Sequence, residues 1–236
     1  TVLLAAMGLA FFKLSVGMGT MMTYGSYFRD DQNIPVTAFR VMCADLFVSM
    51  LAGIAIFPAV FTFGFQPEAG PPLVFITIPA VFAQMPFGHL LMVLFFILTS
   101  VAAIGAMLSL LEVPVAVINE RFGVSRKTAT LLTLLLVALL GSTCALTNST
   151  MAAFKLFGMN MFDLFDYLSS NILLPLGGIA IALFVGWVWG YPALQRAISN
   201  QQQLDNQKLN QLLFLILRFV TPLLILAVML HALNIL

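Results

Sequence analysis

Long apolar stretches separated by short polar or Pro- and Gly-rich segments make up almost the whole chain. Crossing the hydrocarbon core of a bilayer as a helix takes about 20 mostly apolar residues, because each backbone polar group must find its partner inside the segment. Six stretches reach that length, over residues 2–28, 38–65, 88–118, 128–146, 163–190 and 209–233. The pattern predicts an all-α integral membrane protein with no soluble domain.

The connecting segments differ in character. Residues 65–88 are rich in Pro and Gly and contain "LVFITIPAVFAQ", which is too apolar for a solvated loop and predicts short interfacial helices or a reentrant cap. "INERFGVSRKTA" predicts a tight turn and a helix start, with Ser125 as N-cap and Lys127 just inside. "ISNQQQLDNQKLNQ" is the most polar segment and is interpreted as a cytoplasmic linker.

Composition narrows the function classes. Hydrophobic residues make up 61% of the 236 positions and charged residues 8%, against about 25% charged residues in a soluble domain. The net charge of +1 is spread over loops, which leaves no basic patch for nucleic acid. An enzyme is not expected, because no HExxH occurs, the two histidines lack ligand spacing, and Ser15 lacks the glycines of a nucleophile elbow.

The distribution of cations predicts the orientation, because cytoplasmic loops are enriched in Lys and Arg. The cations on the side interpreted as cytoplasmic are Arg29, Arg40, Arg121, Arg126, Lys127, Arg196, Lys208 and Arg218. The opposite loops hold Glu68, Asp163, Asp166 and Lys155. Both chain ends would then lie outside, and Cys43 and Cys144 would be free, buried thiols on opposite sides. The apolar start lacks the basic region of a cleavable signal peptide, and Thr1 in place of Met leads us to expect upstream sequence.

The first apolar stretch is interrupted. Gly17, Gly19 and Gly25 weaken its helix, each by about 1 kcal/mol relative to Ala, and Lys13 places a cation inside it. A helix that breaks at membrane depth exposes backbone groups, which are tolerated where they line a cavity or bind a ligand. The alternative is close packing of a small-residue face against a neighbouring helix.

At these residues the chain resembles a known family. "FFKLSVGMGTMMTYGSYFRDDQNI" is similar to the sixth membrane helix of bacterial neurotransmitter:sodium symporters of the leucine-transporter type. The resemblance continues, in order, with "LAGIAIFPAVFTFG" (seventh helix), "FITIPAVFAQMPFGH" (external loop), "LSLLEVPVAVINE" (eighth) and "FDLFDYLSSNILLPLGGIAIALFVGWVWG" (tenth). It covers essentially the whole chain.

This resemblance implies the fold and its organisation. Residues 1–190 would form the second inverted repeat of a LeuT-type fold, five membrane helices of which the first is broken, and residues 191–236 a cytoplasmic linker and one additional helix. The first repeat is missing from the chain. It would come from the same protein, if this is a fragment, or from a companion chain.

The resemblance also implies site residues. Phe12 resembles the aromatic lid over the substrate, Ser15 and Met18 lie in the unwound stretch facing it, and Leu110 would line the apolar side of the pocket. Tyr27 and Glu120 match the inner gate and Asp166 the outer gate. The alternatives are ordinary core positions for Phe12, Met18 and Leu110 and a solvated loop charge for Glu120.

The departures from the family concern sodium. Lys13 and Ala44 stand where the family has oxygen-bearing side chains of the first sodium site, and Gly105 and Ala106 replace the hydroxyl residues of the second. An ammonium in place of these oxygens suggests a tethered cation, with Asp45 as its candidate partner and Arg40 competing with Lys13 for that carboxylate. Lys13 snorkelling to an interface is the alternative. Glu112, also inside a span, is interpreted as a structural ion-pairing group, with a proton relay as the minor alternative.

The function implied is secondary transport of amino acids or related small zwitterions by alternating access, as half of a multi-pass transporter of the cell's inner (plasma) membrane. Sodium dependence is expected to be weak or absent, with proton coupling or uncoupled exchange instead. No cofactor is expected besides the sodium that the family uses. The alternative is a non-transporting membrane subunit or sensor that retains the transporter fold.

Overall fold

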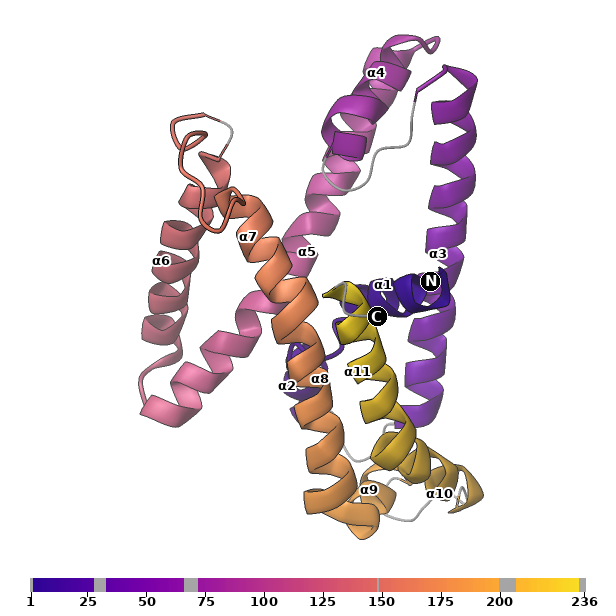
Figure 1. Ribbon diagram of the computed structural model, residues 1–236, viewed down its shortest axis with the longest axis vertical. Helices are drawn as coiled ribbons and strands as arrows, with labels where there is room; N and C mark the ends of the chain where they lie inside the picture. The colour runs from indigo at the N-terminus through magenta and orange to yellow at the C-terminus, as the bar shows by residue number, and fades with distance from the viewer. Residues whose placement is uncertain (1, 28–32, 66–71, 148, 200–206, 234–236) are drawn as a thin grey trace. The chain divides into compact units, whose positions relative to one another are not determined.

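The computed structural model describes residues 2–27, 33–65, 72–147, 149–199 and 207–233, and the regular elements in these ranges are helices (Figure 1). Those long and apolar enough to cross a membrane run over Ile34–Thr62, Gly88–Phe122, Arg126–Ala145, Met161–Ile198 and Gln207–Ala232. The predicted all-helical membrane fold is confirmed. The third and fifth predicted spans continue beyond their apolar cores, to Phe122 and Ile198. Arg29, Glu68 and residues 200–206 of the predicted linker lie outside the described residues.

The chain divides into two compact units. One comprises Thr1–Pro35 and Ser109–Leu236, and the other Val36–Leu108, so that helix α5 (Gly88–Phe122) contributes to both. The division at residues 190 and 191 concerns the repeat organisation and stays a prediction.

In the first unit, α8 (Leu174–Leu183) and α11 (Thr221–Ala232) run side by side, and α1 (Val2–Lys13) packs against α11 (Figure 1). Their contact buries Leu174, Ala182, Ile225 and Val228. These are aliphatic side chains of the kind that fill protein cores, and burying a Leu, Ile or Val contributes about 1.5–3 kcal/mol in water. The described core of this unit therefore lies along α8 and α11.

Three helices are preceded by a wider, π-helical turn that ends just before a proline. Segment η2 (Leu168–Leu173) precedes Pro175 of α8, η4 (Ile216–Val220) precedes Pro222 of α11, and η1 (Leu73–Thr77) precedes Pro79 of α4 (Ile78–Ala83). Proline has no N–H to donate and its ring clashes with the carbonyl four residues earlier. A π turn at that place accommodates the ring without ending the helix.

Helix α6 (Arg126–Ala145) begins at the predicted cap. The Ser125 hydroxyl accepts from the backbone N–H of Thr128 at 3.3 Å, which satisfies one of the donors left open at a helix start. Replacing Ser125 by Ala is expected to destabilise the protein by about 1 kcal/mol. The measurement is a thermal denaturation of the purified protein. Ser142→Ala is the control, because that hydroxyl is exposed in the same helix and donates to the Leu139 carbonyl without capping a helix end; equal melting temperatures of the two variants would contradict the prediction.

The remaining elements of the first unit lie before and after α6 in the chain. They are α2 (Thr20–Ser26), α7 (Met161–Tyr167), η3 (Phe184–Trp189), α9 (Gly190–Ile198) and α10 (Gln207–Leu215). Asn160 caps α7, its side-chain oxygen accepting from the Asp163 N–H at 2.8 Å.

The second unit contains nearly all of α3 (Ile34–Thr62) and the first part of α5, with η1 and α4 in the connection between them. Phe82 of α4 lies 5.7 Å from Phe95 of α5, and Phe75 of η1 stacks on Phe96 at 6.1 Å, both between ring centroids. The short helices predicted in this connection are confirmed, and aromatic contacts hold them on α5.

Both cysteines are free. The expected burial is wrong, since Cys43 is exposed and Cys144 only half-buried. Cys43 lies on α3, where most large apolar side chains of the described helix are exposed as well.

Candidate functional site

The first apolar stretch breaks between α1 and α2. Ser15, Gly17 and Gly19 adopt φ values of 52°, 88° and 79°, in the left-handed region that glycine enters without steric cost. The helical ladder is interrupted there: Ser15 N–H donates to the Phe12 carbonyl, three residues earlier, at 3.1 Å, and Val16 N–H donates to the Phe11 carbonyl, five residues earlier, at 3.0 Å. Ser15 pays for this conformation with roughly 1–3 kcal/mol of backbone strain. The predicted discontinuous helix is confirmed.

Close packing against α8 also explains Gly17. A Cβ on Gly17 would overlap the Leu174 carbonyl oxygen, and a Cβ on Gly177 would overlap the Gly17 carbonyl oxygen. Gly19 sits on the other side of the break, where a Cβ would lie 3.4 Å from Val113 of α5. The two interpretations of these glycines are therefore compatible, because the helix breaks and the break is packed on α8.

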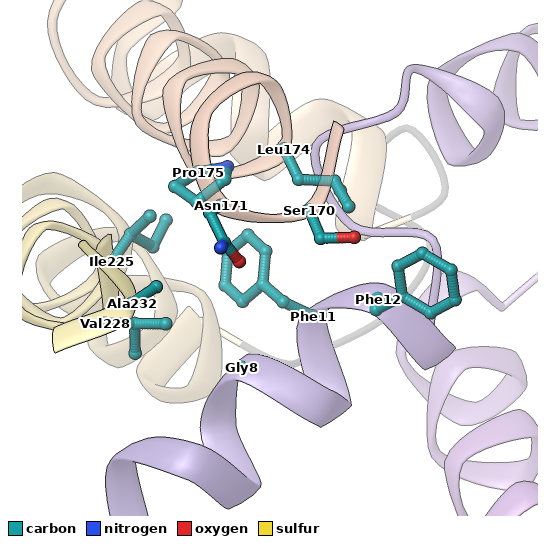
Figure 2. Close-up of a pocket in the computed structure, with 10 residues that line it drawn as sticks. All are labelled: Gly8, Phe11, Phe12, Ser170, Asn171, Leu174, Pro175, Ile225, Val228 and Ala232. Atoms are coloured by element: carbon teal, nitrogen blue, oxygen red, sulfur yellow. The ribbon is translucent and has the colours of Figure 1, made fainter. Parts of the chain in front are cut away.

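A cavity of about 170 Å³ lies beside the break (Figure 2). Its walls come from α1, from η2 with the start of α8, and from α11; they comprise Gly8, Phe11, Phe12, Ser170, Asn171, Leu174, Pro175, Ile225, Val228 and Ala232. Figure 2 shows the Phe11 ring reaching toward Asn171, while the Phe12 ring lies on the Ser170 side. The cavity combines an aromatic and aliphatic lining with a hydroxyl and an amide, as small-molecule sites do.

The predicted substrate residues only partly meet at this cavity. Phe12 lines it and is 50% exposed. Ser15 and Met18 lie half-buried within the break, and Leu110 is exposed on α5; none of these three lines the cavity. Their substrate role stays a prediction.

The other end of the break is tied to α5 and α6. Tyr27, directly after α2, donates its hydroxyl to Glu112 Oε1 at 2.7 Å, and Arg126 Nη2 donates to both Glu112 oxygens at 2.7 Å. We call Tyr27, Glu112 and Arg126 the carboxylate cluster. The Glu112 side chain is 19% exposed and the Arg126 side chain 66%, so the carboxylate is largely withdrawn from water and its charge is balanced by the guanidinium. Tyr24 adds a second link, donating to Ser109 Oγ at 2.6 Å.

This cluster differs from the predicted inner gate. Tyr27 bonds to Glu112 and, within the described residues, has no bond to Glu120, which is exposed two turns farther along α5. The ion-pairing interpretation of Glu112 is confirmed. Neither Arg126, which pairs with Glu112, nor Tyr24, which bonds to Ser109, was predicted from the sequence; for Arg126 the available signal was an acid inside a span and a cation in the first turn of the next helix.

Asp166, the predicted outer gate, is exposed on α7. Ser170 Oγ donates to its Oδ1 at 3.3 Å. The residue also borders a second cavity, of about 360 Å³, with Cys144, Phe162 and Phe165 among its other walls. Its gating role stays a prediction.

The candidate ion positions fall in both units. Lys13 is exposed at the end of α1 in the first unit, whereas Ala44, Asp45, Gly105 and Ala106 belong to the second. Thr99, near these positions in the sequence, donates its hydroxyl to the Phe95 carbonyl at 2.8 Å, and the effect of Gly105 and Ala106 on sodium binding stays a prediction. The pairing of Lys13 with Asp45 stays a prediction. Among the described residues there is no group of three His, Cys, Asp or Glu arranged to hold a metal ion.

Comparison with known proteins adds to this geometry. The model of the sodium:neurotransmitter symporter family matches residues 1–235. The chain is 38% identical over 234 residues to the uncharacterized sodium-dependent transporter YhdH of Bacillus subtilis, covering 99% of this chain and 52% of that protein. It is 34% identical over 223 residues to an uncharacterized sodium-dependent transporter of Haemophilus influenzae, covering 94% and 48%.

A solved structure also matches this chain. The crystal structure of MhsT in complex with L-phenylalanine matches with a TM-score of 0.86 at 41% identity, over 97% of this chain and 51% of that one. The chain thus spans about half the length of these relatives.

Proposed function

Since this chain belongs to the sodium:neurotransmitter symporter family, a family of transporters and not of enzymes, we propose that it forms the second half of a secondary transporter for amino acids or related small zwitterions. The protein is a multi-pass membrane protein, and the cell's inner (plasma) membrane is its proposed location. The complete transport unit requires a first repeat, from the same protein or a companion chain, to supply the other half of the substrate site.

The break from Leu14 to Gly19 is the observation that carries this proposal. Its left-handed residues leave backbone N–H and C=O groups outside the helical ladder, and such groups at membrane depth are tolerated where they line a cavity or grip a ligand. The zwitterionic substrate offers a carboxylate and an ammonium, which pair with such donors and acceptors. The L-phenylalanine bound to MhsT, a structural relative, supports an amino-acid substrate.

The carboxylate cluster provides a closure for the same half. It fastens α2, the part of the broken helix after Gly19, to α5 and to the start of α6. In alternating access the two sides of the site open in turn, so bonds that hold one end of the broken helix must form and break in each cycle. Charge-assisted hydrogen bonds of a half-buried carboxylate suit this task because water can replace them when the site opens.

Sodium dependence is proposed to be weak or absent. Sodium is a hard cation that requires several oxygen ligands, as calcium and magnesium do, whereas Ala44, Gly105 and Ala106 carry no side-chain oxygen. Lys13 would supply a positive charge in place of the bound ion, and a protonated or neutral amine would couple transport to protons. The two bacterial relatives are both named sodium-dependent transporters. The proposal therefore predicts that this chain differs from them in its dependence on sodium.

Uptake into proteoliposomes tests both the proposed transport and the proposed weak sodium dependence. The longest natural form of the protein is reconstituted and supplied with a labelled amino-acid mixture that includes L-phenylalanine, under a sodium gradient, a proton gradient, or choline. We expect uptake in all three that changes less than about twofold when choline replaces sodium, against the tenfold change that 1.4 kcal/mol of coupling would give.

Lys13→Thr is the matching variant, and Lys155→Thr, at an exposed loop position, is its control. We expect Lys13→Thr to lower uptake at least about tenfold, the effect of losing a charged interaction of about 1.4 kcal/mol, and Lys155→Thr to leave it unchanged. Sodium-driven uptake that vanishes in choline would refute the sodium proposal alone. Saturable substrate binding without uptake would refute transport and would support the alternative, a non-transporting subunit or sensor.

A further inference from the structure

Arg218 carries a positive charge inside an apolar helix. It belongs to η4, within the membrane-length segment Gln207–Ala232. Its guanidinium carbon lies 4.3 Å from the ring centroid of Trp187, 5.3 Å from that of Phe219 and 5.8 Å from that of Phe214. We call Arg218 with these three rings the arginine cage.

The cage is built by close backbone packing between two π-helical segments. A Cβ on Gly186 of η3 would lie 2.9 Å from Arg218 Cα, so that only glycine lets η3 and η4 approach this closely. Trp187 and Phe219 meet edge to face with their centroids 6.0 Å apart. π-Helical turns occur frequently at functional sites, and here they set the planes of the rings around the guanidinium.

The charge in the cage has no carboxylate partner among the described residues. No ion pair of Arg218 is present there, and its buried Nε has no hydrogen-bond acceptor. Ring faces attract a cation by about 0.5–2 kcal/mol each, but they accept few of the five N–H bonds that a guanidinium offers. The remaining donors call for an anion with several oxygens.

The surroundings of the cage are positive and accessible. Trp187 is 57% exposed and Phe219 49%, and Arg218 itself is half-buried. Arg196 of α9 and Lys208 of α10 are at the same end of the α8–α11 pair, where α9 packs against α10 (Figure 1). In the described part of the chain beyond residue 190 there is no Asp or Glu; Asp205 lies outside it.

We propose that the arginine cage binds the phosphate of an anionic lipid headgroup. Arginine is well matched to phosphate because its planar fork donates two parallel bonds. Tryptophan beside it favours the membrane–water interface, where headgroups lie. The distribution of cations predicts that this end faces the cytoplasm, whose leaflet is rich in anionic lipid and attracts Lys and Arg. The site is independent of the substrate path and of its coupling ion.

Lipid binding to the longest natural form of the protein tests the site. Phosphatidylglycerol and phosphatidylcholine are titrated separately into the detergent-solubilised protein, and bound lipid is counted by native mass spectrometry. We expect phosphatidylglycerol to bind about fivefold more tightly, the effect of one cation near the membrane surface, and its binding to weaken as salt is raised. Equal affinity of the two lipids would overturn the proposal without recourse to any variant.

Three variants assign the effect to the cage. Arg218→Gln is expected to remove the preference for phosphatidylglycerol, Arg218→Lys to retain part of it, because the charge stays while the planar fork is lost, and Lys155→Gln to leave it unchanged. An undiminished preference in Arg218→Gln would refute the site. If soluble glycerol phosphate displaced phosphatidylglycerol at an equal concentration, the lipid would be refuted as the occupant. A lipid site is expected to bind the lipid more tightly, because the acyl chains also contribute to its affinity.

Discussion

Gly17→Ala is expected to lower the yield and the melting temperature of the folded protein sharply. The new Cβ would overlap the Leu174 carbonyl oxygen, and the residue must hold a φ of 88°. Overpacking costs about 1–3 kcal/mol, and a left-handed conformation about 1–2 kcal/mol for a residue with a Cβ. Their sum is a large part of a stability of about 5–15 kcal/mol.

The measurement is a thermal unfolding curve followed by size-exclusion chromatography. Gly25→Ala is the matched control, since it lies in α2, has no atom within 4 Å of a built Cβ, and should gain up to about 1 kcal/mol of helix propensity. Gly177→Ala touches the opposite side of the same contact and is expected to destabilise as well. If the Gly17→Ala protein had the same melting temperature as the wild type, the break would not be packed on α8.

Glu112→Gln is expected to slow transport strongly while leaving a folded protein. The amide keeps the size of the side chain and one acceptor for Tyr27, but it removes the charge that Arg126 meets at 2.7 Å. Losing a charge-assisted hydrogen bond of this kind corresponds to a roughly tenfold change in an equilibrium. The solvent exposure of Arg126 lowers the static contribution of the ion pair, so we expect the effect on transport to exceed the effect on unfolding.

A double-mutant cycle of uptake rates measures this coupling. Glu112→Gln, Arg126→Ala and the double variant are compared, with Arg121→Ala as a control for an exposed cation of the same turn. If the carboxylate cluster acts as a unit, the double variant is no slower than the slower single variant. Additive losses would show that Glu112 and Arg126 contribute separately and would remove the cluster from the proposed closure.

The sequence predicted the elements of this fold better than it predicted their contacts. The spans and the break follow from local composition, because an apolar stretch must form a helix in a bilayer and glycines such as Gly17 interrupt it. The Ser125 cap is local in the same sense. The carboxylate cluster is not, since Glu112 meets residues from two other elements; the family resemblance pointed to Glu120 as the inner-gate acid, and that role stays a prediction.

The candidate site was likewise predicted only where it depends on local sequence. Phe12 borders a cavity, as an aromatic lid would, but the walls opposite come from η2, α8 and α11, which no spacing in the sequence connects to Phe12. The arginine cage depends on Gly186, whose letter alone does not reveal that another backbone passes beside it.

The contact between Gly17 and Gly177 also carries an evolutionary consequence. Two positions 160 residues apart in the sequence share one steric constraint, but they are not equivalent, because Gly17 is held by both its φ and its space and Gly177 by space alone. In descendants of this sequence, a side chain at position 177 requires only that the two backbones move apart, whereas one at position 17 requires that movement and a change of φ as well. Substitutions should therefore accumulate in a fixed order along this contact, with α8 diverging first and the break persisting as the older feature.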